Sequence, residues 1–223
     1  MNEVTTKPKI KILIVDDHPI VREGLAARLG REPDLDVCGE AEDVADALEK
    51  VKNCQPDLVI IDLSLKSSQG LDLIKRINAS SPSTRTLVSS MFDESLYAER
   101  ALRAGAQGYV NKQEMSEKIV DAIRQVLDGK IYLSSPMTER LLQRAVGAPP
   151  ELSKSTTDIL SDRELEIFRF IGQGKTTRQI AGDLHLSIKT IETHRENIKS
   201  KLNIGNAAEL SREAVRWVME NGG

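Results

Sequence analysis

Between residues 9 and 129, short aliphatic runs alternate with amphipathic stretches. The five runs lie at residues 10–15, 35–39, 58–61, 86–89 and 108–110, and the five amphipathic stretches at 19–29, 44–51, 71–77, 96–104 and 117–127. Strands that alternate with helices form a parallel sheet whose two faces are covered by the helices. The runs at 12–15 and 58–61 are apolar at every position, which is typical of strands buried on both faces. The pattern therefore predicts an α/β domain with a five-stranded, doubly wound parallel sheet.

The composition changes after residue 129. Residues 130–160 are rich in turn-forming Ser, Pro and Gly, so we predict a linker with one short helix over residues 137–146. From Ser161 onward the apolar spacing is helical, and Ser161 with Glu164 matches a capping box. We predict four helices there, the first ending near Gly172 and the others at residues 176–184, 187–202 and 207–219. A second, smaller all-α domain over residues 161–223 follows.

Charge and composition narrow the class of protein. The 223-residue chain has a formal net charge of −3, but residues 175–201 hold six basic and three acidic side chains. That locally positive segment is compatible with nucleic-acid binding. The sequence has no apolar leader and no run long enough to span a bilayer, so we expect a soluble, cytoplasmic protein without membrane contacts. Cys38 and Cys54, the two cysteines, are expected to be reduced core thiols.

Polar side chains follow several of the predicted strands. Asp16 and Asp17 follow the first run, Asp62 follows the third, and Ser90 and Lys112 end later ones. Because the carboxyl ends of parallel strands share one edge of a sheet, we expect these side chains to converge. Such a crevice could hold a hard divalent cation and accept a phosphoryl group on a carboxylate. The simpler alternative is that each aspartate is a solvated turn residue or a helix cap.

In this order, and with the segment Tyr109-Val110-Asn111-Lys112, these residues resemble the receiver domain of two-component response regulators, which has a flavodoxin/CheY-like fold. The resemblance covers residues 9–129. It implies that Asp62 is the phosphoacceptor, that Lys112 and Ser90 contact the phosphoryl oxygens, and that Tyr109 is the switch aromatic. A slip of one residue in the strand would put Ser89 in place of Ser90.

The same resemblance implies a bound Mg²⁺. Its protein ligands would be Asp17 directly, Asp16 largely through water, Asp62, and the backbone carbonyl of Ser64. The chain departs from the family after the phosphoacceptor, where it lacks the usual proline and carries Lys66. We expect the missing proline to leave this loop less constrained, and Lys66 to add a cation beside the acidic crevice.

Residues 160–219 resemble the LuxR-type helix-turn-helix of NarL/FixJ-family regulators. The resemblance rests on Ser161-Asp162-Arg163-Glu164, on the segment at 173–181, and on Thr190-Ile191-Glu192-Thr193-His194. It implies base contacts from Glu192, Thr193 and Glu196. It implies phosphate contacts from Lys189, His194, Lys199 and Lys201, and we place Thr190 and Asn197 in the same DNA-binding set. Because Glu192 and Glu196 replace lysines found in some relatives, the preferred DNA sequence should differ from theirs.

Together these patterns predict a non-enzymatic transcription regulator controlled by phosphorylation. The expected partners are a sensor histidine kinase, double-stranded promoter DNA and a second copy of the chain. The resemblance to the LuxR-type family implies dimerisation through the last helix, where Trp217 either centres the contact or packs in the core. Two alternatives remain: an aspartyl-phosphate phosphatase, which would lack a second aspartate because Ser64 stands there, and a phosphorylation-independent DNA binder that keeps the receiver as a dimerisation scaffold.

Overall fold

The structure is a computed structural model that describes residues 8–65, 68–146, 159–184 and 186–221. The chain divides into two compact units, Met1–Thr138 and Glu139–Gly223. The division falls inside helix α6 (Ser135–Ala145), which lies in the segment predicted to be a linker with a short helix. Lys66 lies outside the described residues. No helix of the described residues is long and apolar enough to cross a membrane.

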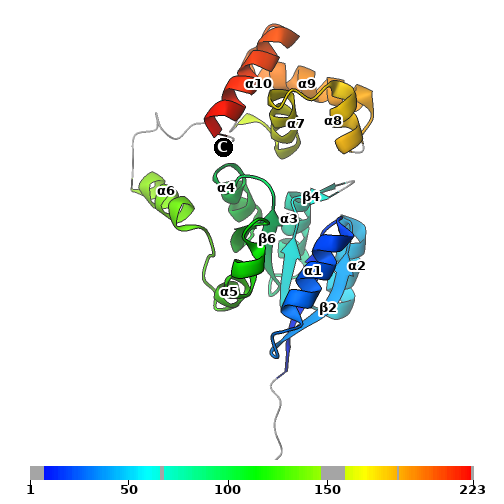
Figure 1. Ribbon diagram of the computed structural model, residues 1–223, viewed down its shortest axis with the longest axis vertical. Helices are drawn as coiled ribbons and strands as arrows, with labels where there is room; N and C mark the ends of the chain where they lie inside the picture. The colour runs from blue at the N-terminus through cyan, green and yellow to red at the C-terminus, as the bar shows by residue number, and fades with distance from the viewer. Residues whose placement is uncertain (1–7, 66–67, 147–158, 185, 222–223) are drawn as a thin grey trace, which may run out of the picture. The chain divides into compact units, whose positions relative to one another are not determined.

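The first unit is built on a parallel sheet (Figure 1). Its strands run in the order β2-β1-β3-β6-β7, and their bounds are β1 (Ile10–Val15), β2 (Leu35–Ala41), β3 (Leu58–Ile61), β6 (Arg85–Ser90) and β7 (Gly108–Asn111). The connecting helices are α1 (Pro19–Leu29), α2 (Val44–Cys54), α3 (Gly70–Ser80), α4 (Glu94–Ala104) and α5 (Met115–Leu127). A short antiparallel pair, β4 (Ser64–Leu65) and β5 (Ser68–Gln69), follows β3. The predicted fold class is confirmed.

Both faces of the sheet are covered. Side chains of α1 and α5 pack with one face of the strands in a core cluster that includes Leu29, Ile60 and Ile123. Helices α2, α3 and α4 contact one another in sequence order on the other side (Figure 1). All four residues of β3 are buried, as its uniform apolar pattern predicts. This double cover leaves the carboxyl edge of the sheet as the place where polar side chains can gather.

The segment after α5 extends the sheet at its β7 edge. Tyr132 pairs with Gly108 in parallel. The Tyr132 N–H donates to the Gln107 carbonyl, and the Tyr109 N–H donates to the Tyr132 carbonyl, both at 2.9 Å. Two residues later, the Ser134 N–H donates to the Glu94 carboxylate at 2.8 Å. Part of the predicted linker is therefore hydrogen-bonded to the α/β unit.

From residue 159 on, the described part of the second unit forms four helices at the predicted places. They are α7 (Asp162–Gly172), α8 (Thr177–Asp183), α9 (Ile188–Leu202) and α10 (Ala207–Asn221). Ser161, Thr176 and Ser187 cap the first three with side-chain hydrogen bonds, and the Ser161–Glu164 capping box is formed. Trp217 is 6% exposed and packs 5.7 Å from the Phe168 ring, so it belongs to the core of this unit.

We expect Gly172→Ala to destabilise the second unit, because α7 and α10 approach closely there. An added Cβ would lie 2.3 Å from the Ala214 carbonyl oxygen and 2.5 Å from Val218 Cγ2. Overpacking of this kind costs about 1–3 kcal/mol in the free energy of unfolding. Chemical denaturation followed by Trp217 fluorescence measures the loss. Gly182→Ala is the matched control, since a Cβ there meets no atom within 4 Å and should stabilise α8 by about 0.5 kcal/mol. Equal effects of the two substitutions would contradict the close-packing account.

Candidate functional site

At the carboxyl edge of the sheet, the ammonium group of Lys112 lies between the carboxylates of Asp16 and Asp62. The Lys112 Nζ atom lies 2.6 Å from Asp16 Oδ2 and 2.7 Å from Asp62 Oδ2. The Asp16 and Asp62 side chains are 3% exposed, and that of Lys112 is 8% exposed. These residues follow β1, β3 and β7, so the parallel register brings together positions that are up to 96 residues apart, from 16 to 112. The predicted convergence of Asp16, Asp62 and Lys112 is present in the structure.

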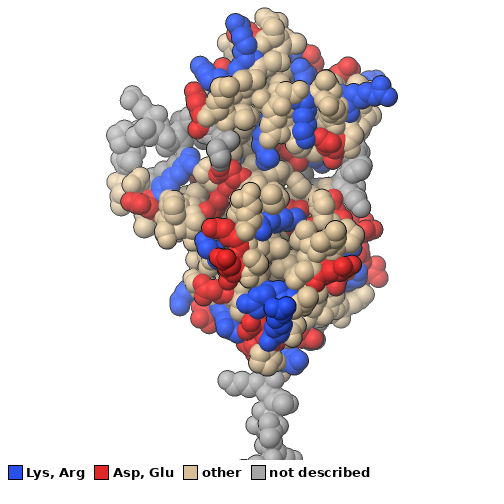
Figure 2. Space-filling model, viewed as in Figure 1, with Lys and Arg blue, Asp and Glu red and all other residues tan. Residues whose placement is uncertain are grey.

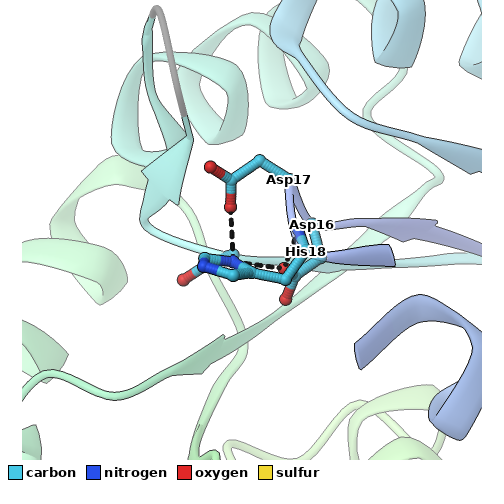
Figure 3. Close-up of side chains that lie close together, drawn as sticks. Asp16, Asp17 and His18 are labelled. Atoms are coloured by element: carbon cyan, nitrogen blue, oxygen red, sulfur yellow. Dashed lines mark hydrogen bonds and ion pairs between the residues drawn. The ribbon is translucent and has the colours of Figure 1, made fainter. Parts of the chain in front are cut away.

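Asp17 lies beside this cluster with His18, a residue that the sequence reasoning did not include in the site. His18 Nδ1 is 2.6 Å from Asp17 Oδ1 and 3.2 Å from Asp16 Oδ1 (Figure 3). The short contact to Asp17 lacks hydrogen-bond geometry, so the buried Asp17 Oδ1 has no hydrogen-bond partner among the described residues. One ligand atom from each of Asp16, Asp17, His18 and Asp62 lies within 4.8 Å of the others. Carboxylate oxygens from three aspartates gathered this closely suit a hard divalent cation.

Burial sets the protonation chemistry of the cluster. Desolvation raises the pKa of Asp62 to about 6, because the contact with Lys112 only partly offsets it and Asp16 adds to it. Burial lowers the pKa of Lys112, but its contacts with Asp62 and Asp16 outweigh that effect and raise it above the ordinary value. At neutral pH the site thus holds ionised carboxylates at a cost, and a bound cation would reduce that cost.

Ser90 and Tyr109 hold the two backbone polar groups of the same residue, Phe92. The Ser90 Oγ atom accepts a hydrogen bond from the Phe92 N–H at 3.2 Å, and the Tyr109 hydroxyl donates to the Phe92 carbonyl at 2.8 Å. Both residues are 1% exposed, and burial raises the pKa of the Tyr109 hydroxyl. Ser89, the alternative to Ser90, instead places its Oγ 2.9 Å from the sulfur of Met115 on α5. Ser64 donates its N–H to Asp62 Oδ1 at 3.2 Å, a contact that does not test the predicted role of its carbonyl.

Gly70 is a further residue of the site, and it was not among the residues predicted from the sequence. It begins α3, and its N–H donates to the Leu63 carbonyl at 3.1 Å. An added Cβ would lie 2.2 Å from the Asp62 carbonyl oxygen and 2.8 Å from Leu63 Cα. Only a glycine therefore lets α3 start directly against the backbone that carries Asp62. The sequence signal is a single glycine shortly after an acidic strand end.

Helix α9 sorts the predicted DNA-binding residues into two groups. One exposed face carries the residues spaced by three or four positions, which are Lys189, Glu192, Thr193, Glu196 and Asn197. Thr190, at the start of the helix, instead holds its Oγ1 2.8 Å from the capping Ser187 Oγ. The exposed face is the part of α9 that a partner molecule could contact.

The second group lies against the helical unit itself. His194 is half-buried, its Nδ1 is enclosed without a hydrogen-bond partner among the described residues, and burial lowers its pKa. Lys201 donates to the buried Glu164 at 2.6 Å, and Lys199 pairs with Glu196 at 2.8 Å. In the view of Figure 2, basic and acidic side chains are interspersed over this unit. Of the basic residues predicted to contact phosphates, Lys189 and Lys201 are exposed, and Lys201 is in addition tied to Glu164.

A parallel α/β unit with an acidic carboxyl edge, joined to a capped helix-turn-helix unit, defines a receiver coupled to a DNA-binding module. The chain matches the response regulator receiver domain family over residues 12–124 and the bacterial regulatory proteins, luxR family, over residues 158–214. It belongs to the NarL/FixJ-type response regulators of two-component systems. Such a protein is a phosphorylation-controlled, DNA-binding transcription regulator rather than a classical enzyme.

Individual relatives cover nearly the whole chain. The oxygen regulatory protein NreC of Staphylococcus carnosus (strain TM300) is 37% identical over 93% of this chain and 97% of its own. RcsB from Salmonella enterica serovar Typhimurium, bound to promoter rprA with a BeF3⁻ phosphomimetic, is 26% identical over 93% of this chain and 98% of that chain, with a TM-score of 0.60. A structure of two RcsB dimers bound to two parallel DNAs is 28% identical over 92% and 97%, with a TM-score of 0.56.

Because the Asp62 pKa is raised, the stability of the α/β unit should fall as pH rises. The folded state binds more protons than the unfolded state between about pH 4 and about pH 6, so without a divalent cation the unfolding free energy decreases over that window. Asp62→Asn should remove this decrease and raise the melting temperature at neutral pH, but not at acidic pH. Thermal unfolding at both pH values measures it.

Two controls isolate the charge of Asp62. Adding MgCl₂ should stabilise the wild type more at neutral than at acidic pH, because only ionised carboxylates bind the cation. Asp57→Asn tests the amino end of the same strand, where an exposed Asp57 accepts a 2.8 Å hydrogen bond from the Lys11 N–H. A melting temperature that rises equally for Asp57→Asn would rule out the burial explanation.

Proposed function

We propose that Asp62 is the phosphoacceptor of this response regulator and that a sensor histidine kinase is its phosphoryl donor. The observation that carries the proposal is the buried Lys112–Asp62 contact of 2.7 Å beside Asp16 and Asp17. A carboxylate oxygen of Asp62 would attack phosphorus, the P–N bond to the kinase histidine would break, and an acyl phosphate would form. Lys112, now paired with Asp62, would follow the new charge and pair with a phosphoryl oxygen.

We propose Mg²⁺ as the resident cation. The oxygens of Asp17 and Asp62, with Asp16 largely through water and the Ser64 carbonyl, would hold it, because Mg²⁺ prefers oxygen ligands and retains several waters. When bound, it would neutralise the negative charge that the carboxylates and the incoming phosphoryl group bring together. The buried Asp17 Oδ1 without a hydrogen-bond partner among the described residues supports this assignment.

The response to phosphorylation would pass through Phe92. The Ser90 hydroxyl, which now accepts from the Phe92 N–H, would turn to donate to a phosphoryl oxygen, and this turn would disturb its bond to Phe92. The backbone of Phe92, whose carbonyl accepts from Tyr109, leads directly to Asp93, the N-cap of α4. Ser90 fits this role better than Ser89, because Ser89 contacts Met115 on α5. Tyr109 and α4 would therefore respond together.

The exposed face of α9 would be the recognition surface for double-stranded promoter DNA. A helix that enters the major groove needs short polar groups for bases and basic groups for phosphates. Glu192, Thr193 and Glu196 would face base edges, with Thr190 and Asn197 near them, and Lys189 would contact phosphate. His194, Lys199 and Lys201 have contacts inside the unit, so we give them a supporting role.

We also propose that the active form is a homodimer. The RcsB relative is described as dimers on DNA, and two copies would place two recognition helices on one duplex. Since the proposed partner is promoter DNA, the expected location is the cytoplasm.

Replacement of the phosphoacceptor should abolish phosphorylation. Incubation of Asp62→Asn with acetyl phosphate and MgCl₂ should leave its intact mass unchanged, whereas wild type and Asp57→Asn should gain one phosphoryl group. Beryllofluoride should raise the duplex affinity and the mass in solution of the wild type and leave Asp62→Asn unchanged. Unchanged affinity and mass of the wild type would favour the phosphorylation-independent DNA binder, and steady release of inorganic phosphate from an ester would favour the phosphatase.

Substitutions on the exposed face of α9 should separate affinity from specificity. Lys189→Ala should weaken binding to all duplexes alike and reduce the salt slope of binding by about one. Glu192→Ala should change the preferred bases and lose about 1–3 kcal/mol of discrimination, because a carboxylate can accept from cytosine N4. Selection from a random duplex library and fluorescence anisotropy measure both. Lys201→Ala is the control, since loss of its pair with Glu164 should lower stability without changing base preference. A Glu192 variant with wild-type preference would exclude this residue from base recognition.

A further inference from the structure

Arg22, on the first turns of α1, contacts the backbone of the acidic crevice rather than its carboxylates. Its Nη1 donates to the backbone carbonyl of Asp16 at 2.6 Å, and its Nε lies 3.4 Å from Glu40 Oε2 at the end of β2. The Arg22 side chain is 16% exposed, whereas Glu40 is 41% exposed. The exposed pair with Glu40 contributes little stability, so the short bond to Asp16 is the more informative contact.

That bond fixes the peptide unit that joins the two acidic residues. The Asp16 carbonyl and the Asp17 N–H belong to one planar peptide. The direction of the carbonyl therefore fixes the orientation of the plane that ends at the Cα atom of Asp17, which carries the side chain. The preceding amide is also fixed, because the Asp16 N–H donates to the Ala41 carbonyl at 3.0 Å. The Asp16 side chain then bonds forward, accepting from the His18 N–H at 2.9 Å. Arg22 therefore completes the set of bonds that holds the turn.

The charge of Arg22 acts in the same direction. Arginine stays protonated at every accessible pH, and its cation lies next to a peptide flanked by two carboxylates. The buried Asp16 and Asp62 and the partly exposed Asp17 repel one another, and the turn would relieve that repulsion by rotating Asp17 outward. Because the Arg22 guanidinium is bound to the Asp16 backbone carbonyl, it opposes this rotation and leaves the space between the carboxylates free.

We propose that Arg22 is a positioning residue for the divalent-cation site, holding the Asp16–Asp17 peptide so that both carboxylates face the crevice. The proposal rests on the cation and phosphoacceptor roles proposed above. Residues behind metal ligands commonly change metal affinity by about 10-fold to 100-fold when they are replaced. Loss of Arg22 should therefore raise the Mg²⁺ concentration that the site needs, while phosphorylation at saturating Mg²⁺ remains close to the wild-type rate.

The alternative is that Arg22 only stabilises the fold, and Arg28 on the same helix provides the comparison. Its Nη1 lies 2.8 Å from Glu32 Oε1 and its Nε donates to the Ser116 carbonyl at 3.4 Å. It therefore has the same two kinds of partner as Arg22, a carboxylate and a backbone carbonyl, away from the crevice. Arg22→Gln and Arg28→Gln remove the same group from the same helix, and Arg22→Lys keeps the charge but not the forked geometry.

The test titrates each full-length variant with MgCl₂ alone, measuring the melting temperature, and then with acetyl phosphate, measuring the phosphorylation rate. We expect Arg22→Gln to need about tenfold more Mg²⁺ for half-maximal effect in both titrations. The phosphorylation rate at saturating Mg²⁺ should remain close to that of the wild type, and Arg28→Gln should keep the wild-type Mg²⁺ midpoint. Arg22→Lys should fall between Arg22→Gln and the wild type.

A wild-type Mg²⁺ midpoint for Arg22→Gln, or a melting temperature lowered equally with and without Mg²⁺, would overturn the proposal. If Arg22→Gln does not fold, Arg22→Lys decides, and an unchanged midpoint in that variant has the same meaning. Failure of the proposed phosphoacceptor role would show separately, because wild-type protein would then bind Mg²⁺ without gaining a phosphoryl group.

Discussion

The contact of Lys112 with two buried carboxylates is the interaction on which the receiver unit depends. Asp16, Asp62 and Lys112 end three different strands, and their side chains meet because the sheet is parallel and covered on both faces. Burial makes the ionised state of Asp62 costly, as its pKa of about 6 indicates. The ionised Asp62 thus carries an electrostatic cost that a bound cation would reduce.

Hydrogen bonds within the same unit link the carboxyl edge of the sheet to α4 and to the segment after α5. Ser90 bonds the N–H of Phe92 and Tyr109 bonds its carbonyl, and Phe92 leads into α4. The strand that carries Tyr109 also accepts the segment after α5 as an edge partner through Tyr132, and Ser134 bonds to Glu94 at the start of α4. These hydrogen bonds connect the strand of Tyr109 and the start of α4 to the beginning of the linker.

In the helical unit, packing decides which charges are available to a ligand. Glu164 is 4% exposed and completes the capping box of α7 while it binds Lys201. Lys199 pairs with Glu196, and His194 lies half-buried against the unit. The exposed face of α9 defined above carries two glutamates and one lysine, and Lys201, which binds Glu164, is exposed as well.

The sequence alone determined the fold class, the helices of the second unit and the gathering of Asp16, Asp62 and Lys112. Hydrophobic periodicity marks each helix and strand locally, and the carboxyl ends of parallel strands share one edge of a sheet. Only the tertiary structure decided contacts between distant backbones and side chains. The close approach of Gly70 to Asp62, the bond from Arg22 to the Asp16 carbonyl and the pairing of Tyr132 with Gly108 leave no periodic signal. The same holds for α9, where the spacing gives the exposed face but only packing against α7 shows that Lys201 is bound to Glu164. Such contacts depend on how elements are placed in space, and a one-dimensional pattern does not contain that information.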